Sequence, residues 1–329
     1  MAYINVDEVY ILDNTGLQVD MATDIPFADA GFTDAQKAQA RANIAAGGTN
    51  PNLLDNPFFT AGAVINQRGS ASYSASAATY TIDRWQLSVN SLGTATLTLA
   101  TDGATIANGY AGGQAYFIQK LDEGMRNAIN GKTVTMSVLY QDGTVKSGSG
   151  VFTLGTTLYA INDTDINFRI YSPNTSRAEP TLDIKASQTI AIKAVKLELG
   201  SVSTLANDVP PDYGTELAKC QRYFVRYKFE TGVGGIGWGY AHTTSALTVF
   251  LPLPVFMAST PTIAQNGALA LQNGVVRYNI TSINTIVLNG DILTLSGNYT
   301  VVSGTAVAGT NGALLLRENG YIDISADIV

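Results

Sequence analysis

Side chains that hold metals or act as nucleophiles are nearly absent from this sequence. Its 329 residues include one cysteine, Cys220, and one histidine, His242. One cysteine excludes an intrachain disulfide, and one histidine excludes metal centres that need two histidine ligands. We therefore expect no cofactor and no metal, and the composition argues against an enzyme.

Charged side chains are also scarce. Only 14% of the residues are charged, and the formal net charge is −7. The densest basic stretch, residues 219–228, holds four Lys or Arg residues with aromatic residues between them. A nucleic-acid-binding protein concentrates positive charge on one face, so we expect no nucleic-acid partner and interpret this stretch as a helix that runs into a strand.

Secretory and membrane-spanning segments are not expected either. The opening segment MAYINVDEVYILDNTG has no basic region and no apolar run of the kind that a secretory signal needs. No stretch of about 18 consecutive apolar residues occurs, so we expect no membrane insertion. We expect the protein to be made in a cytoplasm and to stay soluble.

The residues that are present favour an all-β fold. Gly, Ser, Thr, Asn and Ala are abundant, and 46% of the residues are hydrophobic, a balance that suits strands joined by tight turns. Apolar residues alternate with polar ones at Val134, Met136, Val138 and Tyr140, and again at Leu247, Val249, Leu251 and Leu253. We predict a two-sheet sandwich, specifically a jelly roll, over residues 51–203, and a second β-sandwich over residues 223–329.

One predicted strand changes phase. Ile190 and Ile192 share one parity, whereas Val195, Leu197 and Leu199 share the other. A β-bulge near Ala194 would turn both sets toward the core.

The N-terminal residues 1–30 are too poor in apolar side chains to form a core. The short strand predicted here is followed by a turn at residues 13–16 and consists of Val9, Tyr10, Ile11 and Leu12. Such a strand is marginal alone and would be stabilised by pairing with another chain. We interpret residues 1–30 as an attachment arm, and the alternative is a terminus that lies on the next domain.

Residues 31–50 contain a predicted helix. Thr33 is its N-cap, Gln36 completes a capping box, and Gly47 ends it. Its apolar stripe is thin, which suits close packing of helices around a symmetry axis better than docking on a surface. The stripe consists of Ala35, Ala38, Ala42 and Ala45, and we interpret it as the helical collar of a trimer.

A second helix is predicted in the connector, residues 204–222. Pro210 and Pro211 stiffen the approach, Asp212 caps the helix, and residues 215–222 form about two turns.

The polar motifs do not form a convincing active site. The sequence GVGGIG at residues 232–237 has the spacing of a dinucleotide-binding loop, but no helix-forming run follows it and no acidic residue occurs between Glu230 and Asp291. A loop or strand with close backbone approach explains it better. His242 precedes Thr243, Thr244 and Ser245 without a recognisable nucleophile motif. Two acidic pairs, Asp122 with Glu123 and Asp163 with Asp165, are assigned to solvated turns. Calcium binding is an alternative for Asp163 and Asp165.

Aromatic residues are the more informative candidates. Trp238 and Tyr240 lie in a glycine-rich stretch that offers little apolar packing, so exposure of at least one would suit receptor contact. Sugar rings have apolar faces that stack on such side chains, and we take Trp238, Tyr240 and His242 as glycan-contact candidates. The alternative is that these aromatics fill the C-terminal core or a three-fold axis. Trp85, flanked by Ile82 and Leu87, is predicted to be buried.

Several segments resemble a module that recurs in bacteriophage and prophage fibre and tail proteins. They are NLLDNPFF…INQRG…YTIDRW between residues 52 and 85, and AVKLELGSVSTLANDVPPDYGTELAKCQRYF at residues 194–224. LPLPVFMASTPTI at residues 251–263 resembles a hairpin of phage fibre tips. AQKAQARANI at residues 35–44 resembles an element that precedes the globular parts of trimeric fibres. The stretch from residue 52 to about 200 also resembles jelly-roll carbohydrate-binding modules.

The resemblance implies a homotrimeric, non-enzymatic virion fibre protein made in the host bacterial cytoplasm. Its N-terminal strand at residues 9–12 would bind other virion structural proteins, and its tip would adhere to bacterial surface glycans. Attachment to the tail or to the head stays open. The alternative is a monomeric carbohydrate-binding module, or a component of a polysaccharide-depolymerising enzyme.

Overall fold

The chain divides into two units, residues 1–50 and residues 51–329. The computed structural model describes residues 10–12, 18–20, 50–89, 93–228, 233–266, 269–274, 276–303, 308–309, 311–317 and 320–327. In the first unit, β1 (Tyr10–Leu12) pairs antiparallel with β2 (Gln18–Asp20). The predicted strand is therefore confirmed over Tyr10–Leu12, with a partner in its own chain. Val9 and the predicted collar helix lie outside the described residues.

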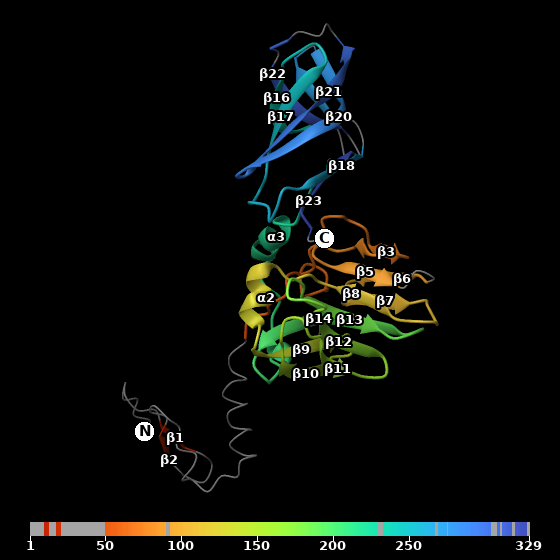
Figure 1. The fold of residues 1–329 in the computed structure, drawn as a ribbon, viewed down its shortest axis with the longest axis vertical. Helices are drawn as coiled ribbons and strands as arrows, with labels where there is room; N and C mark the ends of the chain where they lie inside the picture. Colours follow the sequence, from red (N-terminus) through yellow and green to blue (C-terminus); the bar gives the residue numbers. More distant parts are fainter. Residues whose placement is uncertain are drawn as a thin grey trace. The chain divides into compact units, whose positions relative to one another are not determined.

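The second unit consists mainly of antiparallel strands, which confirms the all-β prediction (Figure 1). Its described helices are α2 (Glu123–Ile129), α3 (Tyr213–Gln221) and a 3₁₀ turn at Leu205–Asn207. No described helix has the length and apolarity needed to cross a membrane.

Two six-stranded sheets form a sandwich. The first sheet has the order β10 (Val145–Val151), β9 (Thr133–Tyr140), β14 (Thr189–Leu199), β7 (Gly103–Asn108), β6 (Ala95–Ala100) and β3 (Ser72–Ala75). The second has the order β11 (Leu158–Asn162), β12 (Ile166–Tyr171), β13 (Glu179–Ile184), β8 (Ala115–Ile118), β5 (Gln86–Val89) and β4 (Thr79–Tyr80).

Trp85 lies in the sandwich core, as predicted. Its side chain is fully buried, stacks on Phe117 with a centroid distance of 4.5 Å, and meets Phe59 edge-on. Its indole Nε1 donates to the backbone oxygen of Asn56 at 2.9 Å. A buried indole needs such an acceptor, so Trp85 fixes the segment around Asn56 against the sandwich.

The predicted bulge in β14 is confirmed. The pairing of β14 with β9 shifts register between Ile192 and Ala194. Ile190, Ile192, Val195 and Leu197 are all buried as a result. Leu199 is an exception to the prediction, because the strand ends there and its side chain is 46% exposed.

Side chains cap both helices. Asp212 accepts from the backbone N of Thr215 at 2.8 Å, which confirms its predicted cap of α3. Helix α2 was not predicted, because Asp122 and Glu123 were assigned to a turn. Asp122 is its N-cap and accepts from the backbone N of Met125 at 2.8 Å.

The C-terminal part corrects the prediction of a second sandwich. Its strands β16 (Val233–Ala241), β17 (Ala246–Pro252), β21 (Ile292–Ser303), β20 (Val276–Asn289), β19 (Leu269–Asn273) and β22 (Asn311–Arg317) close into a barrel. A three-stranded sheet, which we call the base sheet, has the order β15 (Phe224–Lys228), β23 (Tyr321–Ser325) and β18 (Thr262–Asn266). Val225, Ile322 and Ile324 of the base sheet share one hydrophobic core with the barrel interior.

The glycine-rich sequence forms strand β16 and no phosphate-binding loop. A Cβ atom on Gly237 would lie 2.2 Å from the backbone oxygen of Phe250, and one on Gly239 would lie 2.4 Å from that of Thr248. Glycine at these two positions therefore lets β16 approach β17 closely, as the sequence suggested.

Candidate functional site

Strand β16 directs Trp238 and Tyr240 outward from the barrel. They alternate with the buried residues Gly239 and Ala241, as successive side chains of a strand must point to opposite faces. Trp238 is 49% exposed and Tyr240 is 37% exposed. Within this chain, neither side chain fills the barrel core.

Phe250 joins these two side chains from the neighbouring strand β17. Leu247, Val249 and Leu251 of β17 are buried, so Phe250 points outward, and it pairs in register with Trp238. The ring centroids of Trp238 and Phe250 are 5.9 Å apart with an interplanar angle of 27°. Those of Phe250 and Tyr240 are 6.4 Å apart at 29°. We call these three rings, Trp238, Phe250 and Tyr240, the aromatic platform.

His242 continues the platform at one end. It is exposed, and its ring meets that of Tyr240 edge-on with a centroid distance of 5.5 Å. The neighbouring Thr243 hydroxyl oxygen accepts from the backbone N atoms of Ser245 and Ala246. That hydroxyl therefore stabilises the turn between β16 and β17.

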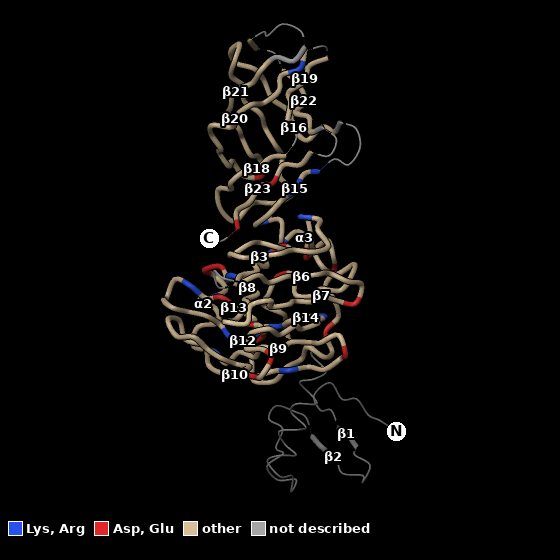
Figure 2. Tube along the Cα trace, turned by 90° about the vertical axis from the view of Figure 1, so that its right-hand side faces the viewer, with Lys and Arg blue, Asp and Glu red and all other residues tan. Residues whose placement is uncertain are grey.

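Uncharged residues surround the platform. Cross-strand pairing places two rows of side chains on this outer face, Ala313–Trp238–Phe250–Thr294–Val287 and Asn311–Tyr240–Thr248–Ser296–Thr285. Between residues 233 and 317 the only charged residues are Arg277, Asp291 and Arg317, all outside these rows. Figure 2 shows the same contrast, with charged residues sparse along the barrel and frequent along the sandwich.

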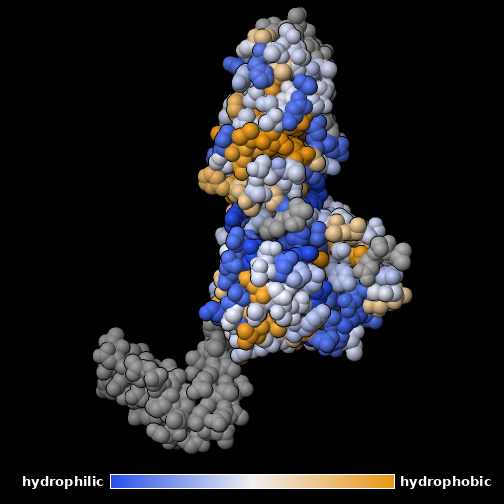
Figure 3. Space-filling view, in the orientation of Figure 1, coloured by the Kyte–Doolittle hydropathy of each residue, from blue (hydrophilic) through white to orange (hydrophobic). Residues whose placement is uncertain are grey.

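The barrel also exposes apolar side chains beyond the platform. Figure 3 shows a hydrophobic area on the barrel, whereas hydrophilic residues predominate elsewhere on that face. Val287, 43% exposed, ends the row that contains Trp238. Phe256, 68% exposed, lies in the loop between β17 and β18 and is no part of either row. Phe256 therefore serves below as a matched control for the platform.

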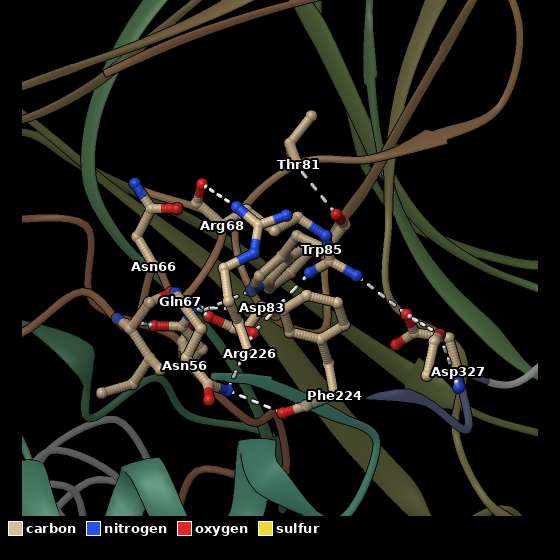
Figure 4. A network of polar contacts seen from close by, with 12 residues as sticks. Asn56, Asn66, Gln67, Arg68, Thr81, Asp83, Trp85, Phe224, Arg226 and Asp327 are labelled. Carbon is tan, nitrogen blue, oxygen red and sulfur yellow. Dashed lines mark hydrogen bonds and ion pairs between the residues drawn. The ribbon is translucent and has the colours of Figure 1, made fainter. Parts of the chain in front are cut away.

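A second group of interacting polar residues joins the sandwich to the base sheet (Figure 4). Gln67 Nε2 donates to the backbone oxygen of Phe224 at 2.7 Å, and the Arg68 guanidinium stacks 3.7 Å from the centre of the Phe224 ring. Arg68 Nη2 donates to Asp327 at 2.9 Å. Arg226 donates two hydrogen bonds of 2.6 Å to Asp323 and a third to the backbone oxygen of Arg68. We call this set, with Asp83, the joint network.

Asp83 is the buried carboxylate of the joint network. It accepts from Gln67 N at 2.7 Å and from Gln67 Nε2 at 3.2 Å, and its Oδ1 lies 3.6 Å from Arg68 Nη1. Burial raises the pKa of Asp83 to about 6, and the Gln67 hydrogen bonds and the Arg68 charge oppose this shift. Burial also raises the pKa of Asp327. The joint network therefore holds the sandwich and the base sheet together. Because two of its buried carboxyl groups have raised pKa values, its contribution to the free energy of unfolding depends on pH.

The two longest motifs singled out in the sequence meet beside this network. The backbone N of Asn56 donates to the buried carboxylate of Glu216 on α3. Arg84 donates to Asp55 at 3.0 Å and stacks 3.5 Å from the centre of the Tyr223 ring. Asn56 and Arg84 both have positive φ, at 52° and 70°, a conformation that surrounding contacts must hold in place. These contacts give the motif residues a structural role, which is to fix α3 on the sandwich.

A small recess of about 230 Å³ lies at this point and contains two carboxylates, Asp55 and Asp122. Asp55 is paired with Arg84, and Asp122 caps α2 and accepts from the Tyr223 hydroxyl at 3.3 Å. Both carboxylates therefore serve structural contacts.

The other acidic pair, Asp163 and Asp165, is held by Lys146. Its Nζ lies 2.8 Å from a carboxylate oxygen of each. Among the described residues, no group of three or more His, Cys, Asp or Glu side chains is arranged to hold a metal ion. The calcium alternative gains no support from these contacts.

Comparisons with protein-family models, with curated proteins and with solved structures found no match to this chain.

Proposed function

We propose that this protein is a non-enzymatic bacteriophage fibre protein that acts as a homotrimer and adheres to bacterial surface glycans. The aromatic platform is the observation that carries this proposal. The Phe250 ring lies within 30° of the Trp238 ring and within 30° of the Tyr240 ring, and Trp238 and Tyr240 are substantially exposed. Such a surface suits the apolar face of a sugar ring, with the hydroxyls of neighbouring Thr and Ser side chains and the amide of Asn311 as hydrogen-bonding groups.

Trimerisation fits this mode of binding. Stacking on an open surface is weak for one site, but a contact repeated in three copies gains avidity through effective concentration. The stripe Ala35, Ala38, Ala42 and Ala45 is the proposed helical contact, and the strand at residues 9–12 is the proposed attachment to other virion proteins, on the tail or on the head. The sandwich, in the proposed jelly-roll form, would then act as a spacer between attachment and tip.

Two measurements test the proposal. Light scattering of the purified full-length chain should give a mass near three times 34.7 kDa. The double variant Trp238→Ala/Tyr240→Ala should keep that mass and its circular dichroism spectrum. Its adhesion to host cells should fall more than tenfold, because truncating exposed anchor residues of this type costs about 2 kcal/mol or more.

The matched control is Phe256→Ala, which removes an exposed aromatic side chain outside the platform and should leave adhesion unchanged. Loss of the trimer in the double variant would mean that these rings form a subunit interface, and would contradict the proposal.

The alternative, a monomeric carbohydrate-binding module or an enzyme component, would use the same platform. A monomeric mass would favour the binding module. Release of reducing ends from a soluble polysaccharide would show depolymerisation and would overturn the non-enzymatic proposal.

A further inference from the structure

The platform and its neighbours carry no formal charge apart from the titratable ring of His242. Both cross-strand rows consist of aromatic, aliphatic, hydroxyl and amide side chains. The charged residues of this part of the chain occupy other backbone positions: Asp291 lies in the β20–β21 turn, Arg277 pairs with Gln272, and Arg317 pairs with Val233 at the far end of β16. Among the residues that the structure describes, the two rows therefore offer a ligand stacking surfaces and neutral hydrogen-bonding groups only.

Anionic polysaccharides need a different surface. Proteins hold carboxylates and phosphates with Arg and Lys side chains, whose charge-assisted hydrogen bonds are about twice as strong as neutral ones. The whole chain has a net charge of −7, so it provides no overall attraction for a polyanion. An acidic glycan on the platform would thus lose part of its hydration and gain no cationic partner.

Taking the proposed glycan binding as given, we infer that the platform selects an uncharged polysaccharide. Successive centroid distances of 5.9 Å and 6.4 Å make the apolar surface larger than a single sugar ring. The ligand is a neutral polymer with an apolar ring face exposed on neighbouring sugars. Acidic capsular polymers and phosphate-linked wall polymers are excluded as platform ligands.

The test measures binding of the full-length protein to a panel of immobilised polymers by interferometry. The neutral members are laminarin, dextran, mannan and hydroxyethylcellulose, and the anionic members are alginate, hyaluronate and a teichoic acid. We expect binding to at least one neutral polymer, a change of less than twofold between 50 and 500 mM NaCl, and a loss of more than tenfold in Trp238→Ala/Tyr240→Ala. Phe256→Ala should bind like the natural chain.

Charge substitutions beside the rings sharpen the test. Thr294 pairs in register with Phe250, and Thr294→Lys and Thr294→Glu place opposite charges at one position. For a neutral ligand the two variants should bind within threefold of each other, whereas an anionic ligand would favour the lysine variant by more than tenfold at 50 mM NaCl.

The possible failures are distinguishable. Platform-dependent binding to anionic polymers alone, weakened more than tenfold by salt, would overturn the inference and leave glycan adhesion intact. Binding to no polymer of either kind, or binding that the double variant leaves unchanged, would overturn both the inference and the proposed role of the platform.

Discussion

Asp83 offers a direct test of the joint network, because two opposing effects act on one carboxylate. Burial disfavours its charged form, whereas Gln67 and Arg68 favour it. If burial prevails, the pKa of Asp83 is about 6 in the folded chain, against 3.8 for an ordinary aspartate. This difference corresponds to about 3 kcal/mol, at roughly 1.4 kcal/mol per pKa unit.

The sign of the pH dependence follows from that difference. Between pH 3.8 and about 6 the folded chain holds a proton that the unfolded chain has released. Asp83 therefore favours the folded state at low pH, and this contribution is lost as the pH rises through the window and then stays constant. The free energy of unfolding of the natural chain, relative to that of Asp83→Asn, should fall by roughly 2 to 3 kcal/mol between pH 4 and pH 7.

Urea unfolding followed by tryptophan fluorescence measures this difference. The chain has two tryptophans, so a Trp238→Phe background leaves the buried Trp85, two residues from Asp83, as the reporter. Asp142→Asn is the control, because Asp142 is exposed and hydrogen bonds from Thr144 lower its pKa. The same comparison should therefore change in the opposite direction for Asp142.

A difference that stays constant with pH would refute the reasoning about burial. A difference that grows with pH would show that Arg68 and Gln67 prevail over burial in the joint network, and that Asp83 is an ordinary stabilising carboxylate.

Three further predictions concern the interior. Gly237→Ala should destabilise the barrel by about 2 kcal/mol or more and lower its Tm, because the new Cβ meets the Phe250 carbonyl. Gly235→Ala is the control, since its Cβ meets only Leu315 at 4.0 Å. Equal losses of stability in the two variants would contradict the close approach of β16 to β17. Lys196→Met should lower the free energy of unfolding by about 3–5 kcal/mol in urea, because it leaves two buried carboxylates without their cation. Lys196 Nζ lies 2.6 Å from Asp208 and 3.6 Å from Glu198, and all three side chains are nearly or fully buried. Lys196→Met/Glu198→Gln/Asp208→Asn should recover most of the loss, and unchanged stability of Lys196→Met would contradict this reasoning. The buried Cys220 thiol, whose pKa is raised by burial, should react with a disulfide reagent only after unfolding, so immediate reaction of the native protein would refute its burial.

Local patterns in the sequence predicted the features that depend on one strand or one helix end. The alternation of Leu247, Val249, Leu251 and Leu253 placed four side chains in the core, where the structure has them. The bulge near Ala194 was predictable because the apolar residues of this strand change there from even to odd positions in the sequence. Asp212 was recognisable as a cap from its position before the helix.

Closure of the barrel was not predictable in this way. Strands in a sandwich and in a barrel both alternate inward and outward side chains, so periodicity does not separate the two. The barrel exists because β16 pairs with β22, about 80 residues later in the chain, as well as with β17. Such pairing is a long-range property.

The platform was predicted in part. Trp238 and Tyr240 were identified, but Phe250 was missed although the parity of β17 already directed it outward. Its place opposite Trp238 depends on strand register, which the sequence does not display. The joint network was missed because Arg68, Asp83 and Arg226 are far apart in the chain, and two charges beside Trp85 were the only local sign of buried ion pairs.

The base sheet restricts rotation of the barrel through several connections and a shared core. The chain passes between base sheet and barrel four times, after β15, before and after β18, and before β23, and both share one apolar core. Four connections and a shared core restrict rotation of the barrel relative to the base sheet more than a single flexible linker would. In the proposed trimer, simultaneous engagement of three platforms would depend on the spacing of sugar chains on the cell as well as on their chemistry. A host could escape such a fibre by changing the density of its surface polymer while leaving every sugar unaltered.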